Sequence, residues 1–205
     1  CTIYDSQFYE LDKHLSNKKY IAHQITDRLR SNPNVYFLTP LAKTNVLLAN
    51  TLPYTNHKRK NNLPIYVIQS NLNQNRRNIS LLVKILSQTY KHKFLFKLVG
   101  RGTLPPPLEP YKNQIIIRNN LNFIDFHKEF IDTYCILPLI TKKSHPHYYE
   151  TKLTSTMNYA SGYNLKCLID KDLQQIYKLD DVEIFNDIDD ISIAFNKTLE
   201  DFYCN

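Results

Sequence analysis

The sequence predicts an α/β fold in which parallel strands form a sheet covered by helices on both faces. From Ile65 onward, short apolar runs alternate with amphipathic segments. The runs are nearly continuous in apolar residues, which is typical of parallel strands that are buried on both faces. Strands that alternate with helices in this way form βαβ units with right-handed crossovers. These observations favour one open, parallel sheet over the greater part of the chain.

The individual elements follow from the periodicity. We expect strands at residues 65–69, 94–99, 114–118, 133–138 and 165–169, and a weaker strand at 182–185. Helices are expected between them, at about 76–89, 124–131, 150–161, 171–177 and 188–203. In the first of these helices Ile79, Leu82, Val83 and Leu86 recur at helical spacing. Gly162 is expected to end the helix at 150–161.

The part before Ile65 is harder to interpret. Residues 3–4, 20–23 and 35–40 suggest strands, and residues 41–49 suggest a helix. No glycine occurs before Ile65, so this part has no glycine-rich phosphate loop. The polar, basic stretch around His57–Lys60 and the following Pro64 predict a linker at 57–64. The chain would then divide into residues 1–56, this linker, and a domain at 65–205.

Composition limits the class of protein. The chain has 205 residues and a formal charge of +7, which suits either an ordinary basic surface or attraction of an anionic partner. No apolar run approaches the roughly 20 residues that span a bilayer. The start of the chain lacks the features of a signal peptide, and because it begins at Cys1 we expect a fragment. The four cysteines are not at metal-ligand spacing, so we expect no metal site and a reducing, cytoplasmic location.

Basic residues and glycines gather where the first two strands of the sheet should end. Arg76 and Arg77 follow the first strand, and Gly100, Arg101 and Gly102 follow the second. Ligands of open α/β sheets bind at the carboxyl ends of the strands. Arginines at the start of a helix can reach an anion held by the helix N-terminus. The alternatives are solvent-exposed arginines on a polar turn and a tight turn at the glycines.

A second group lies at the expected start of the helix at 150–161. Glu150, Lys152, Thr154 and Ser155 would occupy its opening turns. Hydroxyls and free amides there, with the positive end of the helix dipole, suit a diphosphate, and Lys152 adds a point charge. The alternative is a conventional N-terminal cap.

The order of these motifs resembles the C-terminal, donor-binding half of GT-B type glycosyltransferases. The resemblance is carried by the turn at Val99–Gly102, by IIIRNNLNF at Ile115–Phe123 and by the segment from Tyr148 to Ile169. It implies a Rossmann-like domain at 65–205, with residues 1–56 as a remnant of the N-terminal, acceptor-side half. It also implies transfer of a sugar from a nucleoside-diphosphate sugar. The family has two such halves, so the chain would be truncated, a half-enzyme with a partner chain, or a minimal version.

The resemblance also implies roles for single residues. The donor's phosphates would be bound by Arg76, Arg77, Gly100, Arg101, Lys152, Thr154 and Ser155. Asn120 and Leu121 would lie near the nucleobase, and Tyr149 or Glu150 would contact the sugar. Met157 stands where the family has a glutamate that holds the ribose. The family needs no metal or further cofactor, the acceptor (glycan, protein or lipid) stays open, and the catalytic residues are unknown.

Three hypotheses about function therefore remain. The first is a nucleotide-sugar-dependent glycosyltransferase or its donor domain. The second is a non-catalytic α/β module that binds a nucleotide or a partner chain. The third is a basic nucleic-acid-binding protein, although the interleaving of basic and aromatic residues that is typical of RNA-binding proteins is missing.

Overall fold

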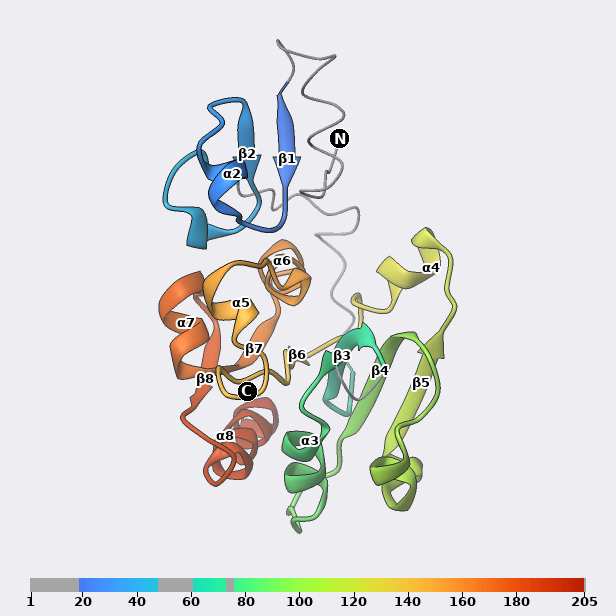
Figure 1. Ribbon diagram of the computed structural model, residues 1–205. Coiled ribbons are helices and arrows are strands. Elements are labelled where there is room, and N and C mark those ends of the chain that lie inside the picture. The colour runs from blue at the N-terminus through green and yellow to red at the C-terminus, as the bar shows by residue number, and fades with distance from the viewer. Residues whose placement is uncertain (1–18, 48–60, 73–75, 205) are drawn as a thin grey trace.

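The protein contains a six-stranded parallel sheet (Figure 1). The computed structural model describes residues 19–47, 61–72 and 76–204. The strands are β3 (Ile65–Asn71), β4 (Leu95–Arg101), β5 (Ile115–Asn119), β6 (Cys135–Ile136), β7 (Lys166–Asp170) and β8 (Val182–Phe185). Their spatial order is β5-β4-β3-β6-β7-β8, which is the doubly wound order 3-2-1-4-5-6. The predicted Rossmann-like α/β fold is confirmed.

Helices cover both faces of this sheet. Along β3, Tyr66 and Ile68 belong to one core and Val67 to the other, because successive side chains of a strand point to opposite faces. The first core is closed by α3 (Ile79–Leu86), α8 (Ile191–Cys204) and the 3-10 helix η3 (Pro106–Gln114). The second is closed by α4 (Phe123–Lys128), α5 (His147–Glu150), α6 (Ser155–Gly162) and α7 (Lys171–Tyr177). Among the described residues, no helix has the length and apolar character to cross a membrane.

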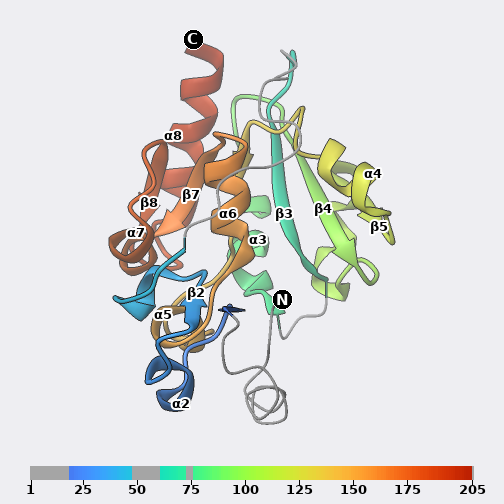
Figure 2. The ribbon, with the colours of Figure 1, turned by 90° about the horizontal axis from the view of Figure 1, so that it is seen from above.

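A small βαβ unit precedes the large sheet. Strands β1 (Tyr20–Ala22) and β2 (Val35–Phe37) are parallel, and α2 (Asp27–Arg30) connects them. A 3-10 turn, η1 (Pro40–Ala42), follows and contacts α7. The unit lies beside α5 in both ribbon views (Figures 1 and 2). Its main chain bonds to the α5–α6 connection, since the Ile25 N–H donates to the Thr151 carbonyl at 2.6 Å.

The helix expected at 41–49 does not form in its described part. Only η1 is helical there, and residues 48 and 49 lie outside the described residues. Lys43 and Asn45 have φ angles of 64° and 49°, in the left-handed region that interrupts a right-handed helix. Val46 instead bridges to Phe37 as an extended residue. The strand expected at 3–4 and residues 57–60 of the expected linker also fall outside the described residues, so the domain division stays a prediction.

The helix expected at 150–161 is two helices. The chain leaves α5 after Glu150 and enters α6 at Ser155, and between them Lys152 forms an antiparallel bridge with Gln24. This pairing draws the backbone into an extended path, so Lys152 lies before the helix and not within it. Gly162 is the last helical residue, and Asn164 supplies the left-handed conformation that follows it.

Several further predictions differ in extent: the helix expected at 124–131 ends at Lys128, and the helix expected from residue 188 begins at Ile191. The helix expected from residue 76 begins at Ile79, and the strand expected at 133–138 is only the two-residue β6.

Candidate functional site

A cavity of about 310 Å³ lies at the carboxyl ends of β3, β4 and β5. Four residues named from the sequence, Gly100, Arg101, Asn120 and Leu121, all line it. The remaining lining residues are Gln69, Ser70, Asn71, Asn122, Phe123 and Phe126. In a sheet of this order, ligands bind outside the carboxyl ends of the strands, near the point where the strand order reverses. That reversal occurs between β3 and β6.

The glycine at the end of β4 is required by close backbone packing. A Cβ at Gly100 would lie 1.5 Å from the Ser70 carbonyl oxygen, so no side chain fits without moving β3. Gly102 has a φ of +115°, which L side chains rarely adopt. The two glycines therefore bring β3 and β4 together at the cavity floor, while Arg101 between them is exposed.

The start of α6 is joined to the end of β3. The exposed Ser155 hydroxyl donates to Gln69 Oε1 at 3.3 Å, and Gln69 also lines the cavity. The N–H of Thr154, the N-cap residue of α6, donates to the Tyr177 hydroxyl at 3.3 Å. Thr154 is buried, and its Oγ1 has no hydrogen-bond partner among the described residues. The first turn of an eight-residue helix thus opens next to the cavity, with one hydroxyl exposed beside it.

The two adjacent arginines have different environments. Arg77 is 7% exposed, and its guanidinium donates to the carbonyls of Gln69 and Arg76, each at 2.7 Å, and to Thr156 Oγ1 at 3.2 Å. Burial lowers the pKa of Arg77, and the neighbouring Tyr148 opposes this effect. Arg77 therefore ties the turn after β3 to α6, and Arg76 is the exposed member of the pair.

Positive groups from separate elements share one neighbourhood. The pKa of His147, at the start of α5, is lowered by burial and then by the charges of Lys152 and Arg76. The pKa of His23, after β1, is lowered by burial and then by Lys152. Among the residues that the structure describes, neither Arg76 nor Lys152 forms an ion pair with an acid. We call Arg76, His147 and Lys152 the basic cluster. With no acid paired to Arg76 or Lys152 in the described part of the chain, the charges of these two residues would attract an anion, while the lowered pKa of His147 favours its neutral form near pH 7.

The predicted sugar-contacting residues face in different directions. Tyr149 is buried, and its hydroxyl donates to Asp170 Oδ1 at 2.9 Å. Burial, with the Asp170 carboxylate second, raises the pKa of Tyr149. Glu150 is exposed, and Met157 is packed into the core below α6. Of the two candidates, only Glu150 has a side chain that a ligand could reach.

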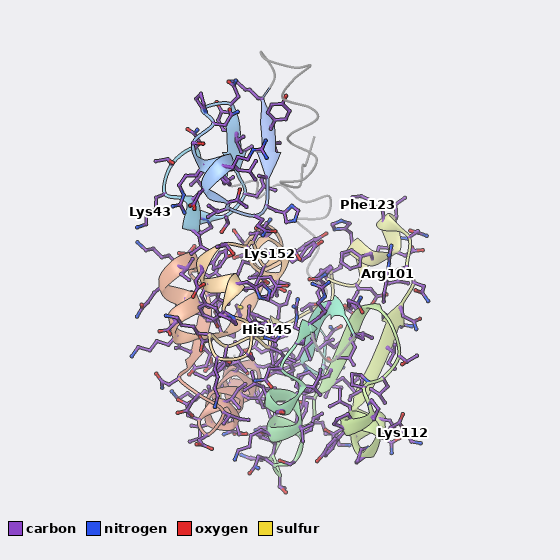
Figure 3. All side chains as sticks on the ribbon, in the orientation of Figure 1. Lys43, Arg101, Lys112, Phe123, His145 and Lys152 are labelled. Carbon is purple, nitrogen blue, oxygen red and sulfur yellow. The ribbon has the colours of Figure 1, made fainter. Side chains whose placement is uncertain are left out.

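Two phenylalanines that were not among the predicted site residues also line the cavity at the carboxyl ends of β3, β4 and β5. Phe123 and Phe126 add aromatic rings to the 310 Å³ cavity, and Phe123 is 70% exposed. Figure 3 shows Phe123 and Arg101 close together on the side of α4. A larger cavity of about 660 Å³ lies between the start of α3 and the loop before α5, and Arg77, Ser80 and His145 are among its lining residues. Phe123 lies two residues after Leu121 in the sequence, and this proximity could have indicated that it lines the same cavity.

In the part of the chain that the structure describes, no group of three His, Cys, Asp or Glu side chains is placed to hold a metal ion.

The comparisons with known proteins find likeness in structure and not in sequence. No family model and no curated protein sequence matches the chain. The structure is similar to the crystal structure of a glycosyltransferase from Rickettsia africae ESF-5, with a TM-score of 0.50 and 13% sequence identity. The match covers all of this chain and 58% of that chain, so this chain spans little more than half of its neighbour's length. At this identity the likeness shows a glycosyltransferase-like fold.

Proposed function

We propose that this chain is a glycosyltransferase, or its donor-binding half, that takes a nucleoside-diphosphate sugar as substrate. The observation that carries the proposal is the position of the basic cluster. It adjoins the first turn of α6, which is tied through Ser155 and Gln69 to the cavity at the carboxyl ends of β3, β4 and β5. A nucleotide needs a cavity for its base and a positive, donor-rich surface for its phosphates, and these lie next to each other here.

The groups have separate roles in this proposal. The base end of the nucleotide occupies the cavity beside Asn120 and Leu121. The diphosphate lies at the start of α6, where the Ser155 hydroxyl would release Gln69 Oε1 to donate to a phosphate oxygen and Arg76 and Lys152 supply charge. When the bond between the sugar and the diphosphate breaks, negative charge grows on the departing oxygen, and nearby positive groups stabilise it most in the transition state. The sugar then extends toward Glu150.

The acceptor side is assigned to the part of the molecule around the βαβ unit. That unit bonds directly to the connection that carries Lys152, so an acceptor bound there would be next to the donor sugar. Because this chain covers 58% of its structural neighbour, the proposal allows residues outside this chain to complete the acceptor site.

Nucleotide binding tests the proposal. We expect UDP or GDP to raise the melting temperature of the protein, because a ligand that binds only the folded state stabilises it by mass action. Arg76→Ala and Lys152→Ala should each weaken binding by about tenfold, since a charged hydrogen bond contributes roughly 1.5–3 kcal/mol. Lys112→Ala is the matched control, because Lys112 is an exposed lysine in η3, away from Lys152 (Figure 3).

The outcomes separate the three hypotheses. Binding of a nucleoside diphosphate together with release of sugar from a nucleotide sugar supports the enzyme. Binding without turnover, in the presence of candidate acceptors, favours a non-catalytic nucleotide module. Salt-sensitive binding of an oligonucleotide, with no effect of any nucleoside diphosphate, refutes the proposal and favours nucleic-acid binding.

A further inference from the structure

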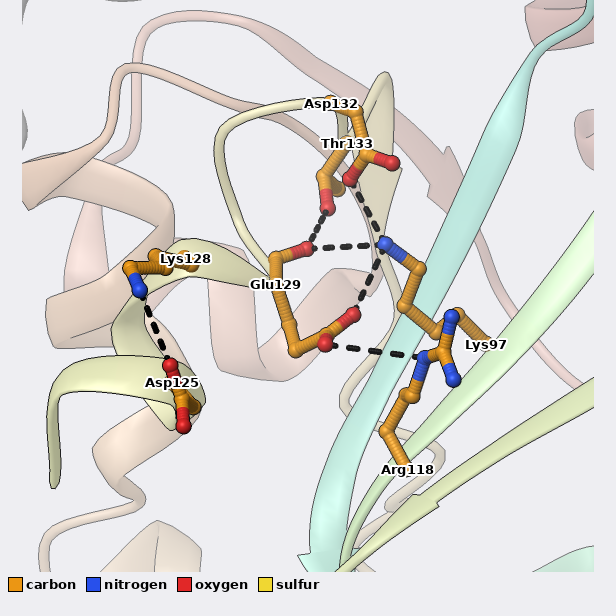
Figure 4. Close-up of polar contacts among 7 residues, drawn as sticks. All are labelled: Lys97, Arg118, Asp125, Lys128, Glu129, Asp132 and Thr133. Carbon is orange, nitrogen blue, oxygen red and sulfur yellow. Dashed lines mark hydrogen bonds and ion pairs between the residues drawn. The ribbon is translucent and has the colours of Figure 1, made fainter. Parts of the chain in front are cut away.

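A lysine is buried in the middle of β4. Lys97 is 3% exposed, although its neighbours in the strand are apolar. Its ammonium group contacts Asp132 Oδ1 at 2.6 Å, Glu129 Oε2 at 3.1 Å and the Glu129 carbonyl oxygen at 3.2 Å (Figure 4). Two of these contacts, with Asp132 Oδ1 and the Glu129 carbonyl, are hydrogen bonds, and the contact with Glu129 Oε2 is an ion pair. A buried charge that is paired in this way is costly to disturb.

The contacts of Lys97 connect three elements. Glu129 is the C-cap residue of α4, where helix carbonyls lack partners and a positive charge is favourable. The other carboxylate oxygen of Glu129 pairs with Arg118 Nε of β5 at 3.5 Å. Lys97 itself belongs to β4. Through Glu129, therefore, one buried ammonium group links β4, β5 and the end of α4.

The same three elements, together with β3, form the cavity at the carboxyl ends of the strands. Gly100 and Arg101 follow Lys97 on β4, Asn120 and Leu121 follow β5, and Phe123 and Phe126 belong to α4. Helix α4 has only six residues, too few for a helix to be stable without tertiary contacts. The position of its first turn, which bears Phe123, therefore depends on how its last turn is held.

We propose that Lys97 is a positioning residue for the base end of the nucleotide site. It fixes α4 against β4 and β5, so that Phe123 and Phe126 remain at the distance from Gly100 and Arg101 that accommodates a nucleobase. This inference rests on the proposed function. It adds that the position of one cavity wall, helix α4, depends on an ion-pair network at the C-terminal end of that helix. This network itself would not contact the ligand.

The inference predicts an effect on one end of the ligand. The diphosphate would be bound by α6 and the basic cluster, to which Lys97 makes no contact. Loss of Lys97 should therefore weaken the binding of nucleoside diphosphates and leave the binding of inorganic pyrophosphate unaffected. If α4 occupies its binding position in only about one molecule in ten, the apparent affinity falls about tenfold.

The chain offers a matched control. Lys166, the first residue of β7, also pairs with two carboxylates, at 2.9 Å with Asp181 and at 3.4 Å with Asp201, and it lies at the amino end of the sheet. Lys97→Met and Lys166→Met each remove one strand ammonium group from two acids. We expect Lys97→Met to raise the dissociation constant of UDP or GDP about tenfold and that of pyrophosphate less than about twofold. Lys166→Met should change neither. The inference would be overturned if Lys97→Met lowered the affinity for the nucleotide and for pyrophosphate equally, or if the two variants changed nucleotide affinity equally.

Hydrogen exchange tests the same inference without any ligand. Amides of residues 123–128 should exchange faster in Lys97→Met than in the wild type, and Lys166→Met should leave them unchanged. If the wild type binds no nucleoside diphosphate but this exchange result holds, the proposed function fails and the attachment of α4 through Lys97 stands. Should Lys97→Met fail to fold, Asp132→Asn is the alternative, because it removes the charge of a partner whose side chain is 30% exposed. This variant should also weaken binding of UDP or GDP more than binding of pyrophosphate, by a smaller factor than Lys97→Met.

Discussion

Replacing Arg77 by Met should cost far more stability than the same change at Arg76. Methionine keeps much of the arginine stem but removes three hydrogen bonds from a charged donor, to the Gln69 and Arg76 carbonyls and to Thr156. Such bonds contribute roughly 1.5–3 kcal/mol each, and relief of the cost of burying the charge offsets part of the loss. We expect a net loss of about 3 kcal/mol in the free energy of unfolding. For a chain of this length that corresponds to a melting temperature lower by about 6–12 °C.

Thermal denaturation followed by circular dichroism measures the difference. Arg76→Met is the matched control, because Arg76 is exposed and its side chain forms no ion pair among the described residues, so the change should stay within about 0.5 kcal/mol. Ligand binding should show the opposite order, with Arg76→Met weakening nucleotide binding in a stable protein. If the two variants melt within about 2 °C of each other, the assignment of Arg77 as the residue that ties the turn to α6 is wrong.

Two other predictions follow from single residues. Gly100→Ala should destabilise the protein by about 3 kcal/mol, because the new Cβ would lie 1.5 Å from the Ser70 carbonyl oxygen and β3 would have to move; urea denaturation checks this, and a loss below about 1 kcal/mol would contradict it. His147, whose pKa is lowered from 6.5 in the folded state, should stabilise the fold above that pH and lose this contribution as the pH falls, because the unfolded chain then binds the proton more readily. The free energy of unfolding should therefore decrease less between about pH 7.5 and about pH 5.5 in His147→Gln than in the wild type, and parallel profiles would refute the assignment.

The large sheet could be predicted because its signals are local. Apolar runs such as Ile65–Gln69 and helical spacing from Ile79 to Leu86 reflect burial of one element against its neighbours, and both appear where the sequence indicates. The end of β6 was predicted too late, because Leu137, Leu139 and Ile140 remain apolar and buried after the strand pairing ends at Ile136. The prediction of a helix at 41–49 was wrong for a different reason. Its apolar residues suit a helix, whereas the left-handed Lys43 and Asn45 depend on tertiary contacts that no local pattern records.

The sequence indicated which residues could lie at the candidate site, but it did not indicate whether each of their side chains would be buried or exposed. Positions after parallel strands converge at one edge of a sheet, so Gly100, Arg101, Asn120 and Leu121 could be assigned to one place. Sequence could not divide Arg76 from Arg77, because burial of one and exposure of the other depend on how α6 packs against the turn. Lys97 did leave a signal, since a single lysine within FLFKLV requires a paired partner if the strand is buried.

The position of Lys152 shows how both parts of the chain would contribute to the proposed site. Its backbone pairs with Gln24, and the next N–H along the chain, that of Leu153, donates to the His23 carbonyl at 2.8 Å. Two residues further on, Ser155 bonds to Gln69 at the end of β3. The connection between α5 and α6 is therefore held by the βαβ unit on one side and by the large sheet on the other. The charge that would bind a diphosphate is thus positioned by a segment outside the large sheet that supplies the cavity, and for that reason the proposed phosphate site would depend on residues 19–47 as well as on the Rossmann-like sheet.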